Sequence, residues 1–369
     1  MTTLPSWLDP RPWLTPEPTV AAVEAALARE DPGPADLAAL LSPAAGPFLE
    51  TMAQRAQALT RRHFGSVISL YAPLYLANHC SSGCAYCGFA SDRGQPRQAL
   101  TLAQVESELA ALRARGLAEV LLLTGERCAE ADLGYVRQCV SLAAAQFPAV
   151  GLETFTMSTD EYRELAAAGA SSVTIYQETY DPDQYARLHR WGPKRDYAAR
   201  LEAPARALAA GFRSVGLGVL LGLAEPRFDA LCLYRHVRAL QRRYWRSGVA
   251  VSFPRLRTQA GGFKAPFPVV QTWLAQMIFA LRLVLPEVPL LLSTREAPAF
   301  RDGMAGLGIS KMSVASRTTV GGYAAARPGA LAQFDVNDER GVDEFCAMLR
   351  RRHLEPVFKN WDAVFRDTA

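Results

Sequence analysis

Three cysteines stand close together near residue 85 of this 369-residue chain. Cys80, Cys84 and Cys87 have the spacing C-x3-C-x2-C, and the aromatic residue Tyr86 precedes the last of them. Three thiolates on one short, glycine-containing loop can bind three corners of a cubane iron–sulfur cluster, which normally takes four thiolates. The fourth iron is then free to bind a small chelating molecule. The spacing therefore predicts a cluster that takes part in chemistry and does not only store electrons.

A structural zinc site and disulfide bonds are the alternatives for this loop. Zinc would need a fourth Cys or His nearby, and His79 adjoins Cys80 too closely to bind the same metal with good geometry. The cysteine count of seven is odd, and residues 1–18 lack the basic-then-apolar pattern of a secretory signal, which disfavours disulfides. We expect free, buried or incidental thiols at the four scattered cysteines, Cys128, Cys139, Cys232 and Cys346.

The composition is that of an ordinary soluble globular protein, with 50% hydrophobic and 21% charged residues. The formal net charge is +4, and the basic residues are spread along the chain, so nothing indicates nucleic-acid binding. No uninterrupted apolar stretch approaches the roughly 18 residues of a membrane span. We therefore expect a cytoplasmic enzyme with neither a nucleic-acid nor a membrane partner.

The elements that position the cysteines follow from hydrophobic periodicity. Residues 1–65 form a helical extension, with one helix over 19–29 and another from Ser42-Pro43 to about residue 63. Strand and helix patterns then alternate. The predicted strands are 67–77, 119–123, 151–155, 172–176, 214–221, 249–253, 290–293 and 309–313. The predicted helices are 102–115, 133–146, 159–168, 198–210, 228–244, 269–285, 297–307 and a final one at 343–353.

This order predicts an α/β fold, a complete (β/α)8 barrel over residues 66–325. Residues 326–369 form a C-terminal extension, with its helix, packed on the barrel. An open barrel with a distorted last strand is the alternative, because 309–313 is short.

Polar residues gather where the predicted strands end, which is where parallel barrels carry their active sites. Carboxylates bind ammonium groups and the planar arginine fork binds carboxylates, so this rim indicates an amino acid or another zwitterionic ligand. The sequences in question are Thr124-Gly125-Glu126, Gln177-Glu178-Thr179, Arg255 with Arg257, Ser293-Thr294-Arg295-Glu296, and Ser313 with Ser316-Arg317.

Each of these groups also has a simpler interpretation. Residues 124–126 could be a helix-capping turn, Glu178 could accept hydrogen bonds from loop amides, and residues 293–296 could form a local salt bridge.

The cysteine loop resembles the C-x3-C-x-aromatic-C signature of the radical S-adenosylmethionine (SAM) enzymes. Over roughly residues 20–363 the chain resembles their aromatic amino-acid lyase branch, and most of all the tyrosine lyases of thiamine synthesis. The shared segments are Leu-Leu-Ser-Pro-Ala-Ala (40–45), Gln-Arg-Ala-Gln (54–57), Pro-Leu-Tyr-Leu (73–76), Tyr-Gln-Glu-Thr-Tyr (176–180), Ser-Phe-Pro-Arg-Leu-Arg (252–257), Leu-Ser-Thr-Arg-Glu (292–296) and Gly-Gly-Tyr-Ala (321–324).

The resemblance implies a [4Fe-4S] cluster held by Cys80, Cys84 and Cys87, with SAM bound at the open iron. Residues Thr124, Gly125 and Glu126 stand where the family has Gly-Gly-Glu, a backbone edge that holds the SAM amino group. Thr124 in place of the first glycine departs from the family pattern but keeps the backbone contact.

Three further SAM contacts follow from the same resemblance. Glu178 matches the acidic residue that binds the ribose hydroxyls, and Arg200 matches the arginine that binds the methionine carboxylate. Tyr86 and the strand at 216–221 would flank the adenine.

On the substrate side, the resemblance implies that Arg295 binds the carboxylate of L-tyrosine, with Tyr75, Ser293 and Ser313 as wall residues. The expected reaction cleaves the Cα–Cβ bond of tyrosine to 2-iminoacetate and p-cresol, with methionine and 5′-deoxyadenosine as the other products. Expected partners are thiazole synthase and a flavodoxin or ferredoxin-type reductant.

Related activities remain as alternatives. The hydrogenase-maturation tyrosine lyases carry a C-terminal C-x2-C pair, which this sequence lacks, so we expect no route to carbon monoxide and cyanide. The tryptophan lyases of thiopeptide pathways share similar strand-end motifs and are separated less cleanly. A non-catalytic electron carrier or sensor, or a structural barrel that serves thiazole synthase as a scaffold, are alternatives of another class.

Overall fold

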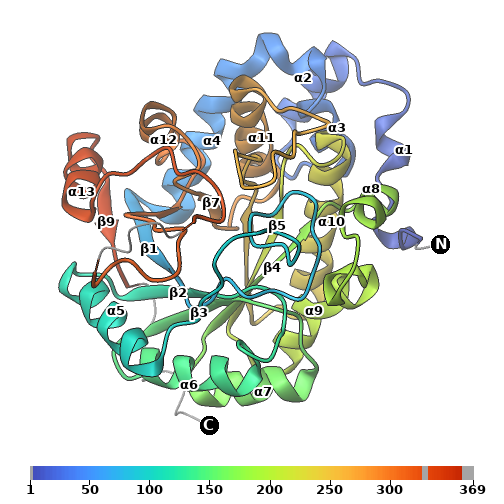
Figure 1. Cartoon of the computed structure of the whole chain (residues 1–369). Coiled ribbons are helices and arrows are strands. Elements are labelled where there is room, and N and C mark those ends of the chain that lie inside the picture. Colours follow the sequence, from blue (N-terminus) through green and yellow to red (C-terminus); the bar gives the residue numbers. More distant parts are fainter. Residues whose placement is uncertain (1–2, 326–330, 360–369) are drawn as a thin grey trace.

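Eight parallel strands form a closed barrel surrounded by helices in this computed structural model, which describes residues 3–325 and 331–359 (Figure 1). Each strand pairs with the next along the chain, and β1 pairs with both β8 and β2. The predicted complete barrel is therefore confirmed, and the open-barrel alternative is wrong. The strands are β1 (Val67–Tyr75), β2 (Glu119–Leu123), β3 (Ala149–Glu153), β4 (Ser172–Glu178), β5 (Ser214–Val219), β6 (Gly248–Ser252), β7 (Leu290–Leu292) and β8 (Lys311–Ser313).

Helices alternate with these strands on the outside of the barrel (Figure 1). Several begin at a residue whose side chain accepts a hydrogen bond from the first-turn backbone, such as Thr101, Asp132 and Ser158. The helices between β1 and β8 are α5 (Leu102–Ala114), α6 (Leu133–Ala144), α7 (Thr159–Ala168), α8 (Pro182–Leu188), α9 (Tyr197–Ala209), α10 (Pro226–Arg243), α11 (Gln271–Val284) and α12 (Pro298–Met304), with the 3₁₀ helix η3 (Pro193–Arg195) before α9.

The strands alternate between two environments. Side chains such as Val120, Leu122 and Leu152 point outward and are fully buried against the helices, where they form the main hydrophobic core. Side chains one position along, such as Leu121 and Glu153, line cavities inside the barrel. Because successive side chains of a strand point to opposite faces, the barrel has an apolar outer layer and an interior that can hold reactive side chains.

The N-terminal extension contains η1 (Ser6–Leu8), α1 (Arg11–Leu14), α2 (Val20–Ala28), α3 (Pro34–Leu40), η2 (Pro43–Phe48) and α4 (Leu49–Phe64). Helix α3 packs on α10 and α11, and α4 packs on α11. Gln276 fixes the contact, because its amide donates to the carbonyls of Leu40 and Ser42 at 2.8 and 2.9 Å.

Differences from the predicted elements are local. The helix predicted from Ser42 to residue 63 is divided, because a 3₁₀ turn that contains Pro47 precedes α4. Strand β4 runs two residues further than predicted, through a bulge between Tyr176 and Glu178. The periodicity did not indicate α3, α8 or the short strand β9 (Glu355–Val357).

The C-terminal part returns to the beginning of the barrel. Residues 331–338, which we name the strap, precede helix α13 (Val342–Arg351) and β9. Strand β9 pairs in parallel with the first residues of β1, from Val67 to Ser69. The final helix was predicted correctly. The division of the chain at residues 65 and 325 stays a prediction, and residues 326–330 and 360–369 of the predicted extension lie outside the described residues.

Over residues 3–325 and 331–359, the structure contains no helix with the length and apolar character that crossing a lipid bilayer requires.

Candidate active site

The three cysteines lie on a loop over residues 78–91, the thiol loop, which follows β1 and is fixed by its neighbours on several sides. The Arg97 guanidinium donates to the carbonyls of Asn78 and Phe89 at 2.6 and 2.8 Å. Arg93 donates to the carbonyls of Ala85 and Cys87. These charged donors hold the loop backbone without using the cysteine side chains, so the thiols remain available.

The thiol groups lie near one another, and backbone amides point at two of them. The N–H groups of Glu126 and Phe89 donate to the sulfurs of Cys80 and Cys87 at 3.3 and 3.4 Å. Burial raises the pKa of Cys80 to about 11, with a further contribution from the Cys87 thiolate. Burial also raises the pKa of Cys84. A bound metal cluster would have to displace these thiol protons.

No three His, Cys, Asp or Glu side chains among the described residues converge on one metal ion. A cubane cluster takes one thiolate at each of three irons, and hydrogen bonds to its sulfurs are usual, so the amide donors at Cys80 and Cys87 fit such a group. All seven cysteines are free thiols.

The edge formed by residues 124–126 lies directly against the thiol loop. A side chain at Gly125 would meet the His79 carbonyl oxygen at 2.4 Å, so only glycine permits this approach. Glu126 is buried and pairs with Arg200 at 3.0 Å between Oε1 and Nη1. Arg200 also donates from Nε to the carbonyl of Tyr176 at 2.6 Å. Thr124 donates to the Gly125 carbonyl at 3.0 Å.

Glu178 and Tyr86 form a second group beside the thiols. Glu178 has a positive φ of 70° at the bulge in β4, and its Oε1 lies 2.6 Å from Nζ of Lys194. Tyr86 shares a 2.8 Å hydrogen bond with Nε2 of His189. Because Nδ1 of His189 donates to the Tyr185 carbonyl, Nε2 accepts from Tyr86 and orients its ring.

One cavity joins the thiol loop to the interior of the barrel and contains about 910 Å³ of space free of protein atoms, its open mouth included. Of the residues assigned from the sequence to the cluster, SAM or the substrate, seven line it: Tyr75, Tyr86, Cys87, Glu178, Ser293, Arg295 and Ser313. The other six, Thr124, Gly125, Glu126, Arg200, Cys80 and Cys84, are not among its lining residues.

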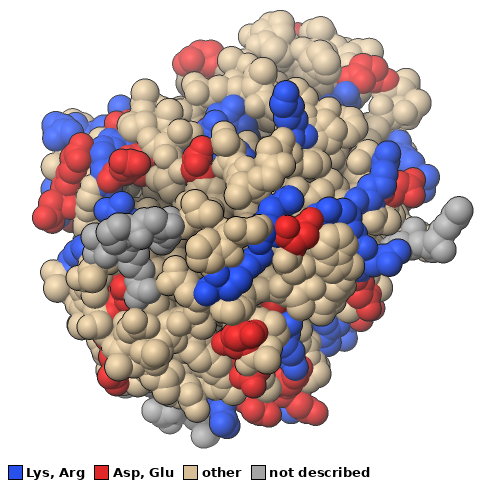
Figure 2. All heavy atoms as spheres, in the orientation of Figure 1, with Lys and Arg blue, Asp and Glu red and all other residues tan. Residues whose placement is uncertain are grey.

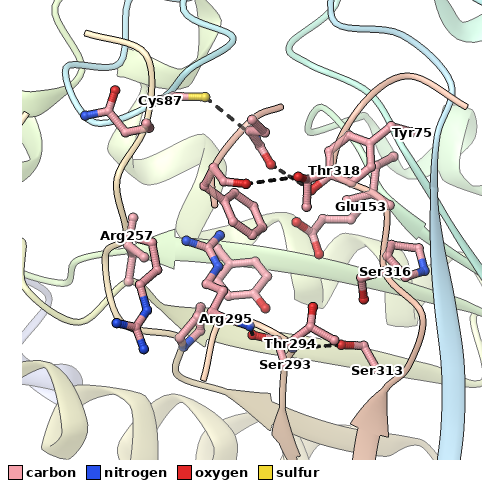
Figure 3. A pocket seen from close by; sticks show the side chains of 18 of the residues that line it. Tyr75, Cys87, Glu153, Arg257, Ser293, Thr294, Arg295, Ser313, Ser316 and Thr318 are labelled. Atoms are coloured by element: carbon pink, nitrogen blue, oxygen red, sulfur yellow. Dashed lines mark hydrogen bonds between the residues drawn. The ribbon is translucent and has the colours of Figure 1, made fainter. Parts of the chain in front are cut away.

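Arg295 also lies in this cavity, and its guanidinium carbon lies 3.4 Å from the centre of the Phe334 ring (Figure 3). The neighbouring arginines are already paired, since Arg255 and Arg257 both contact the buried carboxylate of Glu296. Glu296 therefore pairs with arginines that follow β6, and the local salt bridge considered within residues 293–296 is not formed.

The strap closes one side of the cavity. Tyr75 donates to Oε1 of Gln333 at 2.8 Å, and Nε2 of Gln333 donates to the Cys87 sulfur at 3.6 Å. The Gln333 backbone amide donates to the carbonyl of Thr318 at 2.9 Å. The C-terminal part of the chain thus connects a predicted wall residue with a predicted cluster ligand.

Glu153, at the end of β3, is a cavity residue that the sequence analysis did not single out. Burial raises the pKa of Glu153 to about 7, Glu178 raises it further, and Arg295 opposes the shift. A carboxylate inside the otherwise apolar strand Ala-Val-Gly-Leu-Glu was the available signal. Tyr71, Lys194 and Tyr176 also line the cavity and were missed.

Two glycines of β5 make room for side chains of the neighbouring strand β4, Tyr176 and Thr174. A side chain at Gly218 would meet the Tyr176 ring at 2.2 Å, and one at Gly216 would meet Thr174 at 2.5 Å. From the stretch 216–221 that was expected to flank the adenine, only Leu220 lines the main cavity.

The family model "Radical SAM superfamily" matches residues 74–231, and "Biotin and Thiamin Synthesis associated domain" matches residues 252–355. The chain is 42% identical over 346 residues to 2-iminoacetate synthase of Escherichia coli (strain K12), which covers 94% of this chain and 92% of the relative. The chain belongs to the radical SAM superfamily and, within it, to the family of the 2-iminoacetate synthases. The 2-iminoacetate synthase of Salmonella typhimurium is 41% identical over the same shares of the two chains.

The crystal structure of HydG, a maturase of the [FeFe]-hydrogenase, has a TM-score of 0.87 to this chain at 28% identity. The match covers 94% of this chain and 77% of HydG. Radical SAM enzymes use a [4Fe-4S] cluster and SAM, and the thiol loop with its amide donors and adjoining cavity fits both.

Proposed function

We propose that this protein is a tyrosine lyase, a 2-iminoacetate synthase that cleaves the Cα–Cβ bond of L-tyrosine to 2-iminoacetate and p-cresol. The observation that carries the proposal is one cavity that contains both a thiol of the cysteine loop, Cys87, and the unpaired guanidinium of Arg295. Identity to the two 2-iminoacetate synthases over 94% of the chain supports the same assignment. The match to a domain associated with biotin and thiamin synthesis supports a role in making the thiazole of thiamine.

Cys80, Cys84 and Cys87 would hold the cluster, which together with SAM supplies a carbon-centred radical able to remove a hydrogen atom from the substrate. Glu178 is placed beside Tyr86 at the outer end of the cavity, where ribose hydroxyls and adenine would lie. Gly125 and Glu126 offer a backbone edge against Cys80 that would hold the SAM amino group, and Arg200, which pairs with Glu126, would bind the methionine carboxylate.

Arg295 would bind the tyrosine carboxylate, while Tyr75, Ser293 and Ser313 form the wall. Because Cys87 lines the same cavity, the bound amino acid would lie beside the thiol loop. Holding the two reactants in one enclosed space contributes through orientation and through exclusion of water.

We propose the protein partners from the charge of the surface and from the product of the reaction. A band of Lys and Arg side chains crosses the face that carries the thiol loop (Figures 1 and 2), and Arg93 and Arg190 of this region bind loop carbonyls. Charge complementarity supports an acidic flavodoxin or ferredoxin-type reductant on this face. Thiazole synthase would consume the imine. Seven free thiols suit a reducing compartment, so we place the enzyme in the cytoplasm.

The test is anaerobic reconstitution with iron, sulfide, SAM and dithionite, followed by incubation with L-tyrosine or L-tryptophan. We expect p-cresol and glyoxylate, the hydrolysis product of the imine, from tyrosine alone. Indole products from tryptophan would show instead that the protein is a tryptophan lyase. A cluster that is reduced without forming 5′-deoxyadenosine would show an electron carrier instead.

A further inference from the structure

Five charged side chains among the described residues line the cavity, and their pairing differs. Glu178 is neutralised by Lys194 at 2.6 Å, and Arg257 is neutralised by Glu296 at 2.9 Å. Glu153 and Arg295 remain, and neither forms an ion pair with a described residue. The cavity therefore offers one carboxylate and one guanidinium that are both free to bind a ligand.

These two groups come from opposite parts of the barrel and project into the same space (Figure 3). Glu153 ends β3, whereas Arg295 follows β7. They influence each other electrostatically, because Arg295 lowers the pKa that burial raises at Glu153. A carboxylate and a guanidinium across one cavity match the ammonium and carboxylate of a free α-amino acid.

Among the residues that the structure describes, none donates a hydrogen bond to the carboxylate oxygens of Glu153. Three phenol rings from β1 and β4 surround it, those of Tyr71, Tyr75 and Tyr176, and each interacts electrostatically with it. Tyr75 and Tyr176 direct their hydroxyls elsewhere, to Gln333 and Ser252. The charged groups that face Glu153 are Glu178, Arg295, Lys194 and Arg200.

We propose, on the basis of the tyrosine lyase function, that Glu153 binds the amino group of the substrate and accepts a proton from it. One N–H bond of the ammonium breaks and one O–H bond forms on the carboxylate, so a pair of opposite charges becomes a neutral amine and a neutral acid. The hydrogen atom is then removed from the neutral amine. This order is favourable because the nitrogen radical is formed without a positive charge.

The environment of Glu153 suits this exchange. Burial raises the pKa of its carboxyl group to about 7, which makes it a stronger base toward an ammonium group than an ordinary carboxylate. A base whose pKa lies near the working pH can both hold and release the proton. Arg295 stabilises the substrate carboxylate at the same time, so the two ends of the amino acid are recognised by different strands.

Measurements of ligand affinity distinguish a role of Glu153 in binding the amino group from a purely structural role. We would titrate reconstituted enzyme, loaded with SAM and free of reductant, with L-tyrosine and with 3-(4-hydroxyphenyl)propionate, which lacks the amino group. The same titration uses L-tryptophan and indole-3-propionate. Glu153→Gln should weaken amino-acid binding about tenfold or more and leave the desamino compounds unchanged. Glu153→Asp should recover part of the affinity, and the exposed Glu106→Gln is the matched control.

The pH dependence of turnover tests whether Glu153 accepts a proton from the amino group of the substrate. In the wild type, kcat/KM for tyrosine should level off near neutral pH. In Glu153→Gln it should continue to rise toward pH 9, because the free amine must then come from solution.

Equal affinity of wild type and Glu153→Gln for the amino acid, or equal losses for the desamino compounds, would overturn the inference alone. Failure of the wild type to bind any of the four compounds would overturn the lyase function and this inference with it.

Discussion

Arg200 and Glu126 form a buried ion pair directly behind the thiol loop, with 3.0 Å between Nη1 and Oε1. The amide of the same glutamate donates to the Cys80 sulfur. A charge pair between helix α9 and the residues after β2 therefore sets the position of a backbone donor at a predicted cluster ligand.

Removing one member of this pair should be costly. Arg200→Met leaves the Glu126 charge buried without a partner, and we expect the free energy of unfolding to fall by about 3–5 kcal/mol. Urea unfolding of the apoprotein measures this loss. The double variant Arg200→Met/Glu126→Leu should recover most of it, because no uncompensated charge remains. A double variant as unstable as the single one would show that the pair does not carry the effect.

The variant Arg295→Ala tests whether Arg295 binds the carboxylate of tyrosine. The lost charge-assisted hydrogen bonds correspond to roughly 10- to 100-fold in kcat/KM for p-cresol formation. Uncoupled SAM cleavage to 5′-deoxyadenosine should change much less, because SAM is expected to bind nearer the thiol loop. Both products are measured in one chromatographic assay, with the exposed Arg137→Ala as the control. Parallel loss of both products would argue against a substrate role.

Gly125→Ala tests the contact between the thiol loop and the edge at residues 124–126. The added methyl group would meet the His79 carbonyl at 2.4 Å and Cβ of Cys80 at 2.7 Å, so the loop must move. We expect a reduced iron and sulfide content after reconstitution and weaker SAM binding. Gly46→Ala is the matched control, because its methyl group would meet nothing within 4 Å. Full cluster content in Gly125→Ala would contradict the close fit.

His236 should make stability depend on pH. Burial lowers the pKa of His236 from 6.5 to about 4, and its Nδ1 shares a 2.9 Å hydrogen bond with Tyr180. The unfolded chain therefore binds more protons than the folded one between pH 6.5 and 4. Stability is fully present above pH 6.5 and falls by about 3 kcal/mol as the pH drops through this window. Thermal unfolding from pH 4 to 8 should show a smaller decline in His236→Gln.

The sequence was informative wherever a residue pattern is local. The cysteine spacing located the thiol loop, and hydrophobic periodicity located all eight barrel strands to within a few residues. Short elements were missed, because α3, α8 and β9 contain too few residues to show a period. The proline at position 47 was visible, but the 3₁₀ turn around it depends on tertiary contacts.

The site was harder to predict because it joins residues that are distant in the chain. Glu153 and Gln333 are ordinary polar residues in the sequence, and only the closure of the barrel brings them beside Arg295 and Cys87. Likewise, the sequence could not tell which rim arginine is free. The structure distinguishes Arg295 from Arg255 and Arg257 through the position of Glu296.

The contact between Gln333 and Cys87 spans 246 positions of the chain. During synthesis the thiols leave the ribosome long before the segment that comes to cover them has been translated. The contact of residue 333 with Cys87 therefore forms last, after the loop that carries the thiols has been translated.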